Sequence, residues 1–182
     1  MKKAMLLVAL AAWVGVTGVS SVSSAQEGPP KPAPEHKRIE YFKGTWNFVG
    51  DAKASPMGPG GAITFKEVCE LMDGGFALVC RSDGKNPMGP SKAISIMSYD
   101  VEKKAYTYTA AETKNPVFTA YGQVSNGTWN WKTESTMGGK TMAVLVTITE
   151  KGGTAYDFKM EMAMDGGAPT TVMEGKATKS GT

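Results

Sequence analysis

Short segments in which apolar and polar residues alternate recur along most of this chain, and compact turns separate them. Trp46 and Phe48 share one face of such a segment, and Ile94 and Ile96 share one face of another. Strand-length segments at this spacing favour an antiparallel sandwich or barrel over an α/β fold. The dipeptide Asn126-Gly127 between two segments is a strong hairpin signal. We therefore predict an all-β fold of about ten strands.

The connections between the predicted strands alternate in character. Even-numbered connections are compact, as at Asp73-Gly74-Gly75, whereas odd-numbered connections carry Met-Gly or Pro. In an up-and-down antiparallel sheet, alternate connections lie at opposite ends, and closure into a barrel removes exposed edges. We expect one end closed by tight hairpins and a mouth at the other end. The methionines predicted to rim that mouth are Met57, Met88, Met137 and Met164.

The first 25 residues are expected to be a secretory signal peptide that is removed from the mature protein. Lys2 and Lys3 precede the apolar run Met5–Val16, and small residues follow at Ser23-Ser24-Ala25. This order is typical of a cleaved signal. The apolar run is too short to cross a bilayer, so no transmembrane segment is expected after cleavage. We predict an exported protein, either periplasmic or secreted.

The mature chain is expected to be a single barrel domain at residues 35–180 behind a flexible lead at residues 26–34. Apolar positions before Gly44 predict a short helix that precedes the first strand. Loss of Lys2 and Lys3 with the signal peptide takes the formal net charge from +3 to +1. The chain shows no basic stripe of the kind that binds nucleic acid, so no such partner is expected.

Cys69 and Cys80 are the two cysteines of the chain, and they flank Gly74-Gly75. If these glycines form a two-residue hairpin loop, Leu71 faces Leu78 and Cys69 faces Cys80. Directly opposed residues are close enough for a disulfide, and an exported protein meets an oxidising environment. We predict a disulfide between them; a pair of small core residues is the alternative.

A ten-stranded barrel encloses more space than an eight-stranded one, which can already hold a small ligand. The interior is predicted to be a ligand cavity, and a core filled by aromatic side chains is the alternative. The candidate lining residues are those on apolar strand faces: Trp46, Phe65, Glu67, Tyr108, Trp131, Phe158, Met160 and Met162.

Glu67 lies on the same alternating face as Phe65 and Cys69, so an unbroken strand points its carboxyl group inward. A carboxyl group among apolar neighbours needs a partner or has a raised pKa. It could orient a ligand in an otherwise apolar pocket. The alternative is a bulge that turns Glu67 outward, or a position at the rim.

Met160, Met162 and Met164 form a stripe with a period of two residues. Thioethers are ligands for Cu(I), but they also provide an adaptable apolar lining. We favour the lining, and we expect neither a metal site nor a cofactor.

His36 is the single histidine of the chain. A neutral imidazole could act as an acid or a base at neutral pH, whereas a lone histidine beside a short helix more often hydrogen-bonds the chain. The sequence offers no Ser-His-Asp triad or zinc-ligand cluster, so no catalytic residue is assigned.

Short motifs occur in order along the first half of the mature chain: Pro34-Glu35-His36, Gly44-Thr45-Trp46, Met57-Gly58-Pro59-Gly60, Asp73-Gly74-Gly75-Phe76 and Ser98-Tyr99-Asp100. Together they resemble the bacterial family called domain of unknown function 1579. The resemblance covers most of the mature chain and fades at Met173–Lys176. It implies a lipocalin-type or nitrobindin-like β-barrel. Nitrobindin-like barrels bind haem through a histidine late in the chain, where this chain has none, so that mode of haem binding is not expected.

Three functions fit these observations. The leading hypothesis is a non-enzymatic exported barrel that binds a small apolar or amphipathic molecule, with Glu67 as the polar anchor. The second is an enzyme on the same barrel, with Glu67 or His36 as acid or base, which the scarcity of titratable groups on apolar faces disfavours. The third is a filled barrel whose methionine-bearing rim contacts a partner. The oligomeric state is left open.

Overall fold

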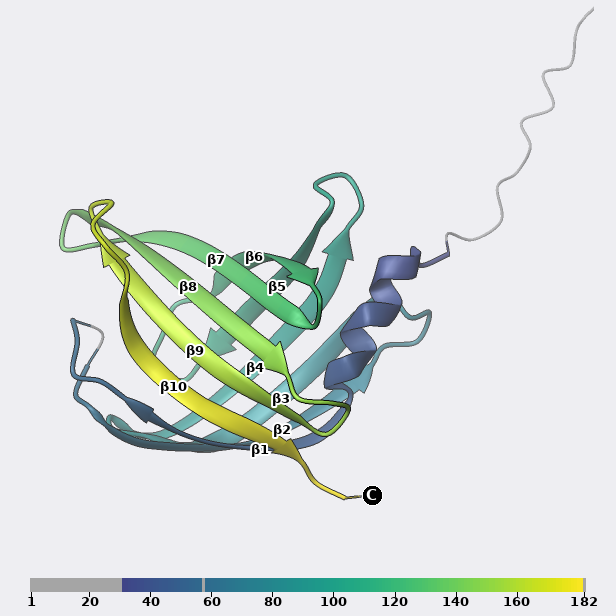
Figure 1. Ribbon diagram of the computed structural model, residues 1–182, viewed down its shortest axis with the longest axis horizontal. Coiled ribbons are helices and arrows are strands. Elements are labelled where there is room, and N and C mark those ends of the chain that lie inside the picture. Colours follow the sequence, from purple (N-terminus) through teal and green to yellow (C-terminus); the bar gives the residue numbers. More distant parts are fainter. Residues whose placement is uncertain (1–30, 57, 182) are drawn as a thin grey trace, which may run out of the picture. The chain divides into compact units, whose positions relative to one another are not determined.

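The computed structural model describes residues 31–56 and 58–181, and the predicted signal peptide and Met57 lie outside them (Figure 1). A short 3-10 helix, η1 (Pro34–Phe42), precedes the strands. The strands follow in order: β1 (Gly44–Ala52), β2 (Gly61–Leu71), β3 (Ala77–Asn86), β4 (Gly89–Asp100), β5 (Ala105–Glu112), β6 (Phe118–Ser125), β7 (Thr128–Met137), β8 (Lys140–Glu150), β9 (Ala155–Met164) and β10 (Thr170–Lys179). Among the described residues, no helix has the length and apolar character that a membrane crossing requires.

Every strand pairs antiparallel with the next one along the chain, and β1 pairs with β10 to close the barrel. The closing register places Trp46 opposite Lys179 and Ala52 opposite Met173. The predicted all-β, ten-stranded, up-and-down barrel with a short N-terminal helix is therefore confirmed. Closure leaves no unpaired sheet edge between β1 and β10, which protects the sheet from edge-to-edge association.

The β2–β3 turn is longer than the predicted two-residue loop. The Met72 N–H donates to the Ala77 carbonyl at 2.8 Å, and the Gly75 N–H donates to the Met72 carbonyl at 3.0 Å. Gly74 and Gly75 have φ angles of 88° and 77°, which an L side chain rarely adopts. The two extra residues are added symmetrically, one on each side of the glycines, so Leu71 still faces Leu78 as predicted.

Helix η1 lies across the end of the barrel that carries the compact even-numbered connections (Figure 1). The Tyr41 hydroxyl donates to the Ala155 carbonyl at 2.6 Å, next to the β8–β9 turn. Glu150, at the end of β8, accepts hydrogen bonds from Arg38 of η1 and, at 2.7 Å, from Trp129 Nε1. These contacts tie the helix to the strand ends and close that end of the barrel.

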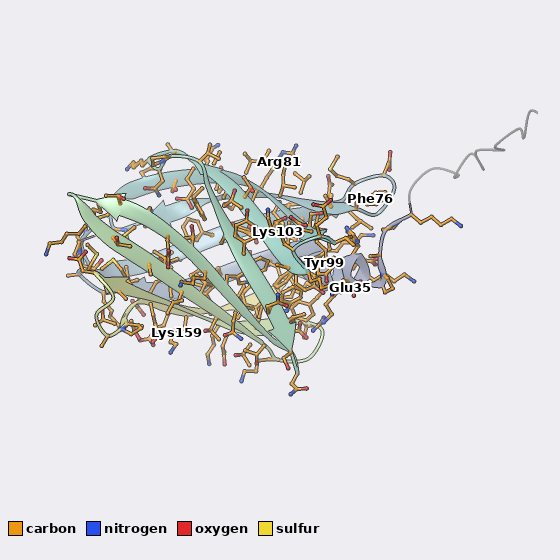
Figure 2. All side chains as sticks on the ribbon, turned by 90° about the horizontal axis from the view of Figure 1, so that it is seen from above. Glu35, Phe76, Arg81, Tyr99, Lys103 and Lys159 are labelled. Carbon is orange, nitrogen blue, oxygen red and sulfur yellow. A yellow bond between two sulfur atoms is a disulfide. The ribbon has the colours of Figure 1, made fainter. Side chains whose placement is uncertain are left out.

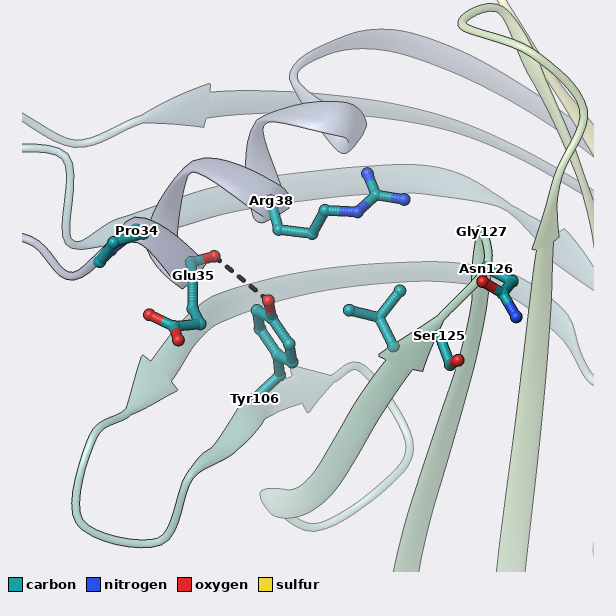
Figure 3. Close-up of a pocket in the computed structure, with 8 residues that line it drawn as sticks. Pro34, Glu35, Arg38, Tyr106, Ser125, Asn126 and Gly127 are labelled. Atoms are coloured by element: carbon teal, nitrogen blue, oxygen red, sulfur yellow. Dashed lines mark hydrogen bonds between the residues drawn. The ribbon is translucent and has the colours of Figure 1, made fainter.

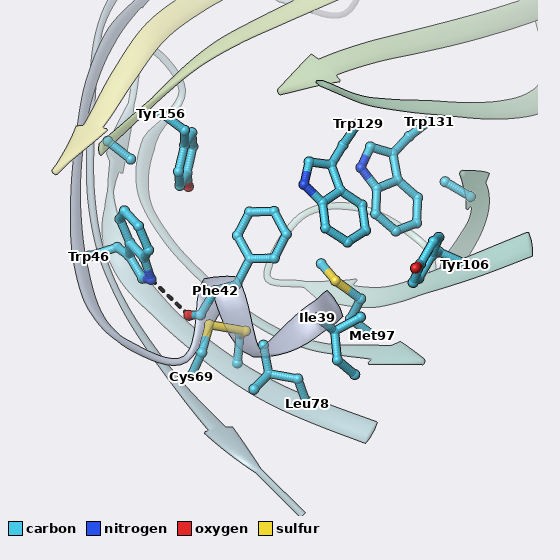
Figure 4. Close-up of a cluster of buried hydrophobic side chains, with 13 residues drawn as sticks. Ile39, Phe42, Trp46, Cys69, Leu78, Met97, Tyr106, Trp129, Trp131 and Tyr156 are labelled. Carbon is cyan, nitrogen blue, oxygen red and sulfur yellow. Dashed lines mark hydrogen bonds between the residues drawn. A yellow bond between two sulfur atoms is a disulfide. The ribbon is translucent and has the colours of Figure 1, made fainter. Parts of the chain in front are cut away.

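A cluster of buried apolar side chains fills the barrel beneath η1 and forms a floor (Figure 4). Ile39 and Phe42 of η1 insert into it, and the Trp46 Nε1 donates to the Phe42 carbonyl at 2.7 Å. The Trp129 and Trp131 rings are stacked at 5.9 Å between centroids, and Trp129 meets Tyr106 edge-on at 4.8 Å. Burial of large aromatic side chains provides most of the stabilisation available to such a floor.

Candidate ligand site inside the barrel

The register of the strands determines which side chains face the inside, because directly paired residues lie on the same side of a sheet. Trp46 is buried in the floor cluster and pairs with Glu67 of β2, which in turn pairs with Ser82 of β3. The β2–β3 pairing runs without interruption through Glu67, so no bulge turns this residue outward. Side chains of the opposite face, such as Arg81 and Lys159, point to solvent (Figure 2).

The middle of the barrel interior retains accessible surface. Inward-facing residues of the floor are buried. Inward-facing residues two or four positions further along the strands are only partly buried: Phe48, Phe65, Glu67, Tyr108, Phe158 and Met160. The part of the interior above the floor is therefore less completely filled than the floor itself. At the end away from η1, the inward-facing Ser135 is exposed, which indicates that the mouth lies there.

The Glu67 carboxylate lies within 4.8 Å of the sulfur atoms of Cys69 and Cys80. Among the described residues it has no hydrogen-bond partner and no ion pair. Burial raises its pKa above the ordinary value of 4.5. Burial also raises the pKa of Tyr108 and of Tyr156, and the charge of Glu67 raises both further. An inward carboxyl group thus lies near two phenol groups without a cation to neutralise it.

The predicted disulfide between Cys69 and Cys80 is confirmed, with 4.0 Å between the two Cα atoms. Both cysteines are buried in the floor cluster and are direct partners across β2 and β3. Because each sulfur is bonded to the other, neither is a free thiolate donor for a metal beside Glu67. The bridge fixes the segment of β2 that carries Glu67 two residues away.

Two aromatic rings of the inner wall lie against glycines of neighbouring strands. A Cβ atom built on Gly84 would lie 2.6 Å from Cδ1 of Phe65, its direct partner. A Cβ atom on Gly175 would lie 2.5 Å from Cζ of Phe48. These glycines leave room for the two rings beside the neighbouring strands.

The remaining predicted lining residues fall into two groups. Trp46 and Trp131 belong to the buried floor cluster. Met162 is buried in a second cluster nearer the mouth, with Met142, Val144 and Val172. Met160 is partly buried and packs against this second cluster. The predicted rim residues Met137 and Met164 do the same.

Of the other predicted rim residues, Met88 is 43% exposed in the β3–β4 connection, and Met57 lies outside the described residues. Sequence reasoning missed three members of the site: Phe48, Tyr156 and the buried Ser95, whose side chain hydrogen-bonds Tyr108. Phe48 and Tyr156 were on predicted apolar faces, whereas Ser95 carries no signal without the register that pairs it with Cys80.

His36 lies apart from this interior. It is buried at the start of η1, where Nδ1 is 3.3 Å from the Ala33 carbonyl oxygen. Its ring meets Phe76 edge-on at 5.5 Å and Tyr99 at 5.8 Å between centroids. These neighbours differ from those of Glu67, so the two residues proposed as alternative acid–base groups do not form a pair.

Two surface hollows lie outside the barrel interior. The first, of about 410 Å³, lies between η1 and the β6–β7 turn, and its polar groups are engaged: the Tyr106 hydroxyl donates to the Glu35 carbonyl at 3.3 Å, and Arg38 binds Glu150 (Figure 3). The second, of about 690 Å³, is a groove along β8, β9, β10 and β1 with Lys159 and Lys176 beside Asp51, Asp157 and Glu174.

The fold and the site together define a closed all-β barrel whose inner wall carries aromatic side chains. The chain belongs to the DUF1579 family, whose members are described as proteins of unknown function and whose family model matches residues 31–179.

Among solved structures, the chain is similar to the crystal structure of Rv2717c from M. tuberculosis, with a TM-score of 0.56 and 11% identity over 83% of this chain and 100% of that chain. It is also similar to the S-type phycobiliprotein lyase CPES from Guillardia theta, with a TM-score of 0.56 and 8% identity over 81% of this chain and 93% of that chain. At these identities the likeness shows the fold alone. Comparison with curated proteins finds no match.

Proposed function

We propose that this protein binds a small amphipathic molecule in the interior of the barrel and catalyses no reaction. The observation that carries the proposal is the partial accessibility of inward-facing side chains above a closed floor, as at Phe48, Phe65 and Tyr108. An apolar wall with a few polar groups is the usual composition of a small-molecule pocket. Met160 and the neighbouring methionine cluster supply a lining that can adapt to the shape of an apolar group.

The proposal includes export to an oxidising compartment. The order of charged, apolar and small residues in the first 25 residues supports it. The disulfide between Cys69 and Cys80 also supports it, because disulfides persist mainly in oxidising compartments.

A tryptophan placed in the interior tests the proposal. Ala93 faces inward on β4, where it pairs with Ser82 and Glu112, and it is only partly buried. The adjacent Ile94 faces outward and is 43% exposed. Ala93→Trp should occlude the interior, whereas Ile94→Trp makes a similar change on the outer wall.

The measurement is the fluorescence of Nile red, a neutral dye that emits strongly in apolar surroundings. We expect the parent and Ile94→Trp to bind the dye with similar affinity, and Ala93→Trp to bind it at least about tenfold more weakly. Circular dichroism establishes that all the proteins are folded. Equal dye binding by the two tryptophan variants would place the dye outside the interior and contradict the proposal.

A further inference from the structure

We infer that the interior site selects amphiphiles with a cationic head, whose ammonium group binds the Glu67 carboxylate while the apolar tail extends toward the methionine cluster at the mouth. This inference rests on the proposed function and adds the chemical class of the ligand. It follows from the charges, the ring faces and the direction in which the site opens.

Among the described residues no cation forms an ion pair or a hydrogen bond with Glu67, and burial is the cause of its raised pKa. Lys179, a cation on the same face of the sheet, lies over the Trp46 ring instead. The described groups that face it are Trp46 from β1, Ser82 and the disulfide from β3, Tyr108 from β5 and Tyr156 from β9. Burial raises the pKa of both tyrosines, so they are neutral around pH 7. A carboxylate removed from water without a partner is costly, and a bound cation relieves that cost.

The aromatic wall is complementary to a cation. The face of an aromatic ring carries the negative part of its quadrupole and attracts an ammonium group. Phe48 and Phe65, which are direct partners on β1 and β2, place aromatic rings on the inner wall two residues from Trp46 and Glu67. The same faces repel an anionic head. The chain itself shows this preference on the inner wall, where Lys179 Nζ lies 5.0 Å from the centroid of the Trp46 ring.

The position of the polar group sets the orientation of the ligand. Glu67 lies directly above the disulfide and the floor, so a head group bound there is at the deep end of the interior. The second apolar cluster, with Met142, Met162 and Val172, lies toward the mouth. The apolar tail would therefore contact Met160 and this cluster, with the head pointing inward.

Displacement of Nile red by three amphiphiles with the same ten-carbon tail tests the inference. At about pH 8, decylamine is cationic, decanol is neutral and decanoate is anionic. Each is used below the concentration at which it forms micelles. We expect decylamine to displace the dye from the parent at a concentration at least about tenfold lower than either of the others.

Substitutions of Glu67 test whether its carboxylate causes the preference for decylamine. Glu67→Gln keeps the shape of the side chain and removes its charge. In this variant decylamine and decanol should displace the dye at similar concentrations, and the dye should still bind. Glu67→Asp moves the carboxylate back by one methylene and should keep part of the preference. Glu70→Gln removes a charge from an exposed residue of the same strand. The three amphiphiles should displace the dye from this variant in the same order as from the parent.

The outcomes separate this inference from the proposed function. If Ala93→Trp blocks the dye but the parent binds the three amphiphiles equally, or binds decanoate best, the site exists and the cationic preference is wrong. A decylamine preference that persists in Glu67→Gln would also overturn the inference. Dye binding that Ala93→Trp does not weaken would overturn the proposed function itself.

Discussion

Phe65 of β2 and Gly84 of β3 are direct cross-strand partners, and the phenyl ring occupies the space in which a side chain at position 84 would stand. A Cβ atom there would lie 2.6 Å from Cδ1 of Phe65 and 2.0 Å from the backbone oxygen of Thr64. The ring could move, but the backbone oxygen cannot move without disturbing the strand pairing. The glycine is therefore required both for the ring position and for the close approach of β2 and β3.

The first prediction follows from this pair. Gly84→Ala should lower the free energy of unfolding by about 1–3 kcal/mol, because the added methyl group overpacks a site with no free volume. Gly153→Ala is the matched control, since a Cβ atom there meets nothing within 4 Å, and it should change stability by less than about 0.5 kcal/mol. Urea unfolding measures both. Equal stability of the two variants would contradict the packing described at Gly84.

The pH dependence of stability provides a second prediction. Burial raises the pKa of Glu67 in the folded state above 4.5, so folding favours the protonated carboxyl group. The contribution of Glu67 to stability is therefore greatest at low pH. This contribution falls as the pH rises from about 4.5 to the raised pKa of the folded state. Above the raised pKa it no longer changes with pH.

Glu67→Gln removes this titration. Relative to the parent, the variant should gain stability as the pH rises, by about 1.4 kcal/mol for each pH unit between the two pKa values. Glu70→Gln, at an exposed position of the same strand, should not show this gain. Unfolding measured between about pH 4 and pH 8 gives both curves. A constant difference between Glu67→Gln and the parent over that range would mean that Glu67 is not buried.

The disulfide leads to a third prediction. Cys69 and Cys80 are separated by 11 residues, so their bridge closes a short loop in the unfolded chain. Replacing both by alanine should lower the free energy of unfolding by about 2–3 kcal/mol. The unfolded parent should show no titratable thiol without reductant, and reductant should leave the stability of the double variant unchanged. Two free thiols per chain in native protein would contradict the bridge.

The contact between Glu150 and the helix end of the barrel leads to a fourth prediction. Glu150→Ala leaves the buried Trp129 N–H and the Arg38 guanidinium without their shared acceptor. This should cost about 1–3 kcal/mol of stability and shift tryptophan emission to longer wavelength.

Glu174→Ala is the control for this change, because Glu174 pairs with Lys53 at 2.9 Å on the exposed outer face. Loss of an exposed ion pair should cost less than about 1 kcal/mol. If both alanine variants lost the same stability, Glu150 would not have a special role in holding η1 to the barrel.

The fold could be predicted from the sequence because strand alternation and turn residues are local signals. The Cys69–Cys80 pairing was also predictable, since the extra turn residues are symmetric and leave the register unchanged. The periodicity of β4 groups its residues into two faces but does not show which face is inward. Ile94 and Ile96 alternate like a core face, yet they are 43% and 46% exposed, while Ser95 and Met97 are buried. A strand that lines an interior with space in it can have small and polar residues inward, so hydrophobicity alone does not identify its inner face.

Other features of the site depend on contacts between strands. The inward direction of Glu67 followed from the alternation of β2, but its proximity to Tyr108 and Tyr156 depends on the positions of β5 and β9. The need for glycine at position 84 cannot be inferred from the sequence of β3. It becomes clear only when the cross-strand partner, Phe65, is known. The helix before the first strand was predictable from its apolar residues, whereas its place across the barrel end depends on Arg38 reaching Glu150.

The most direct test of the open interior is the NMR spectrum of protein with labelled methionine methyl groups, recorded with a neutral apolar nitroxide. Met160 faces the interior, whereas Met72 is 52% exposed at the closed end and Met88 is 43% exposed in a connection. A nitroxide that enters the interior should broaden the Met160 resonance most, and Ala93→Trp should abolish that broadening. Stronger broadening of Met72 and Met88 than of Met160 would show that apolar molecules bind the outer surface and would contradict a ligand site inside the barrel.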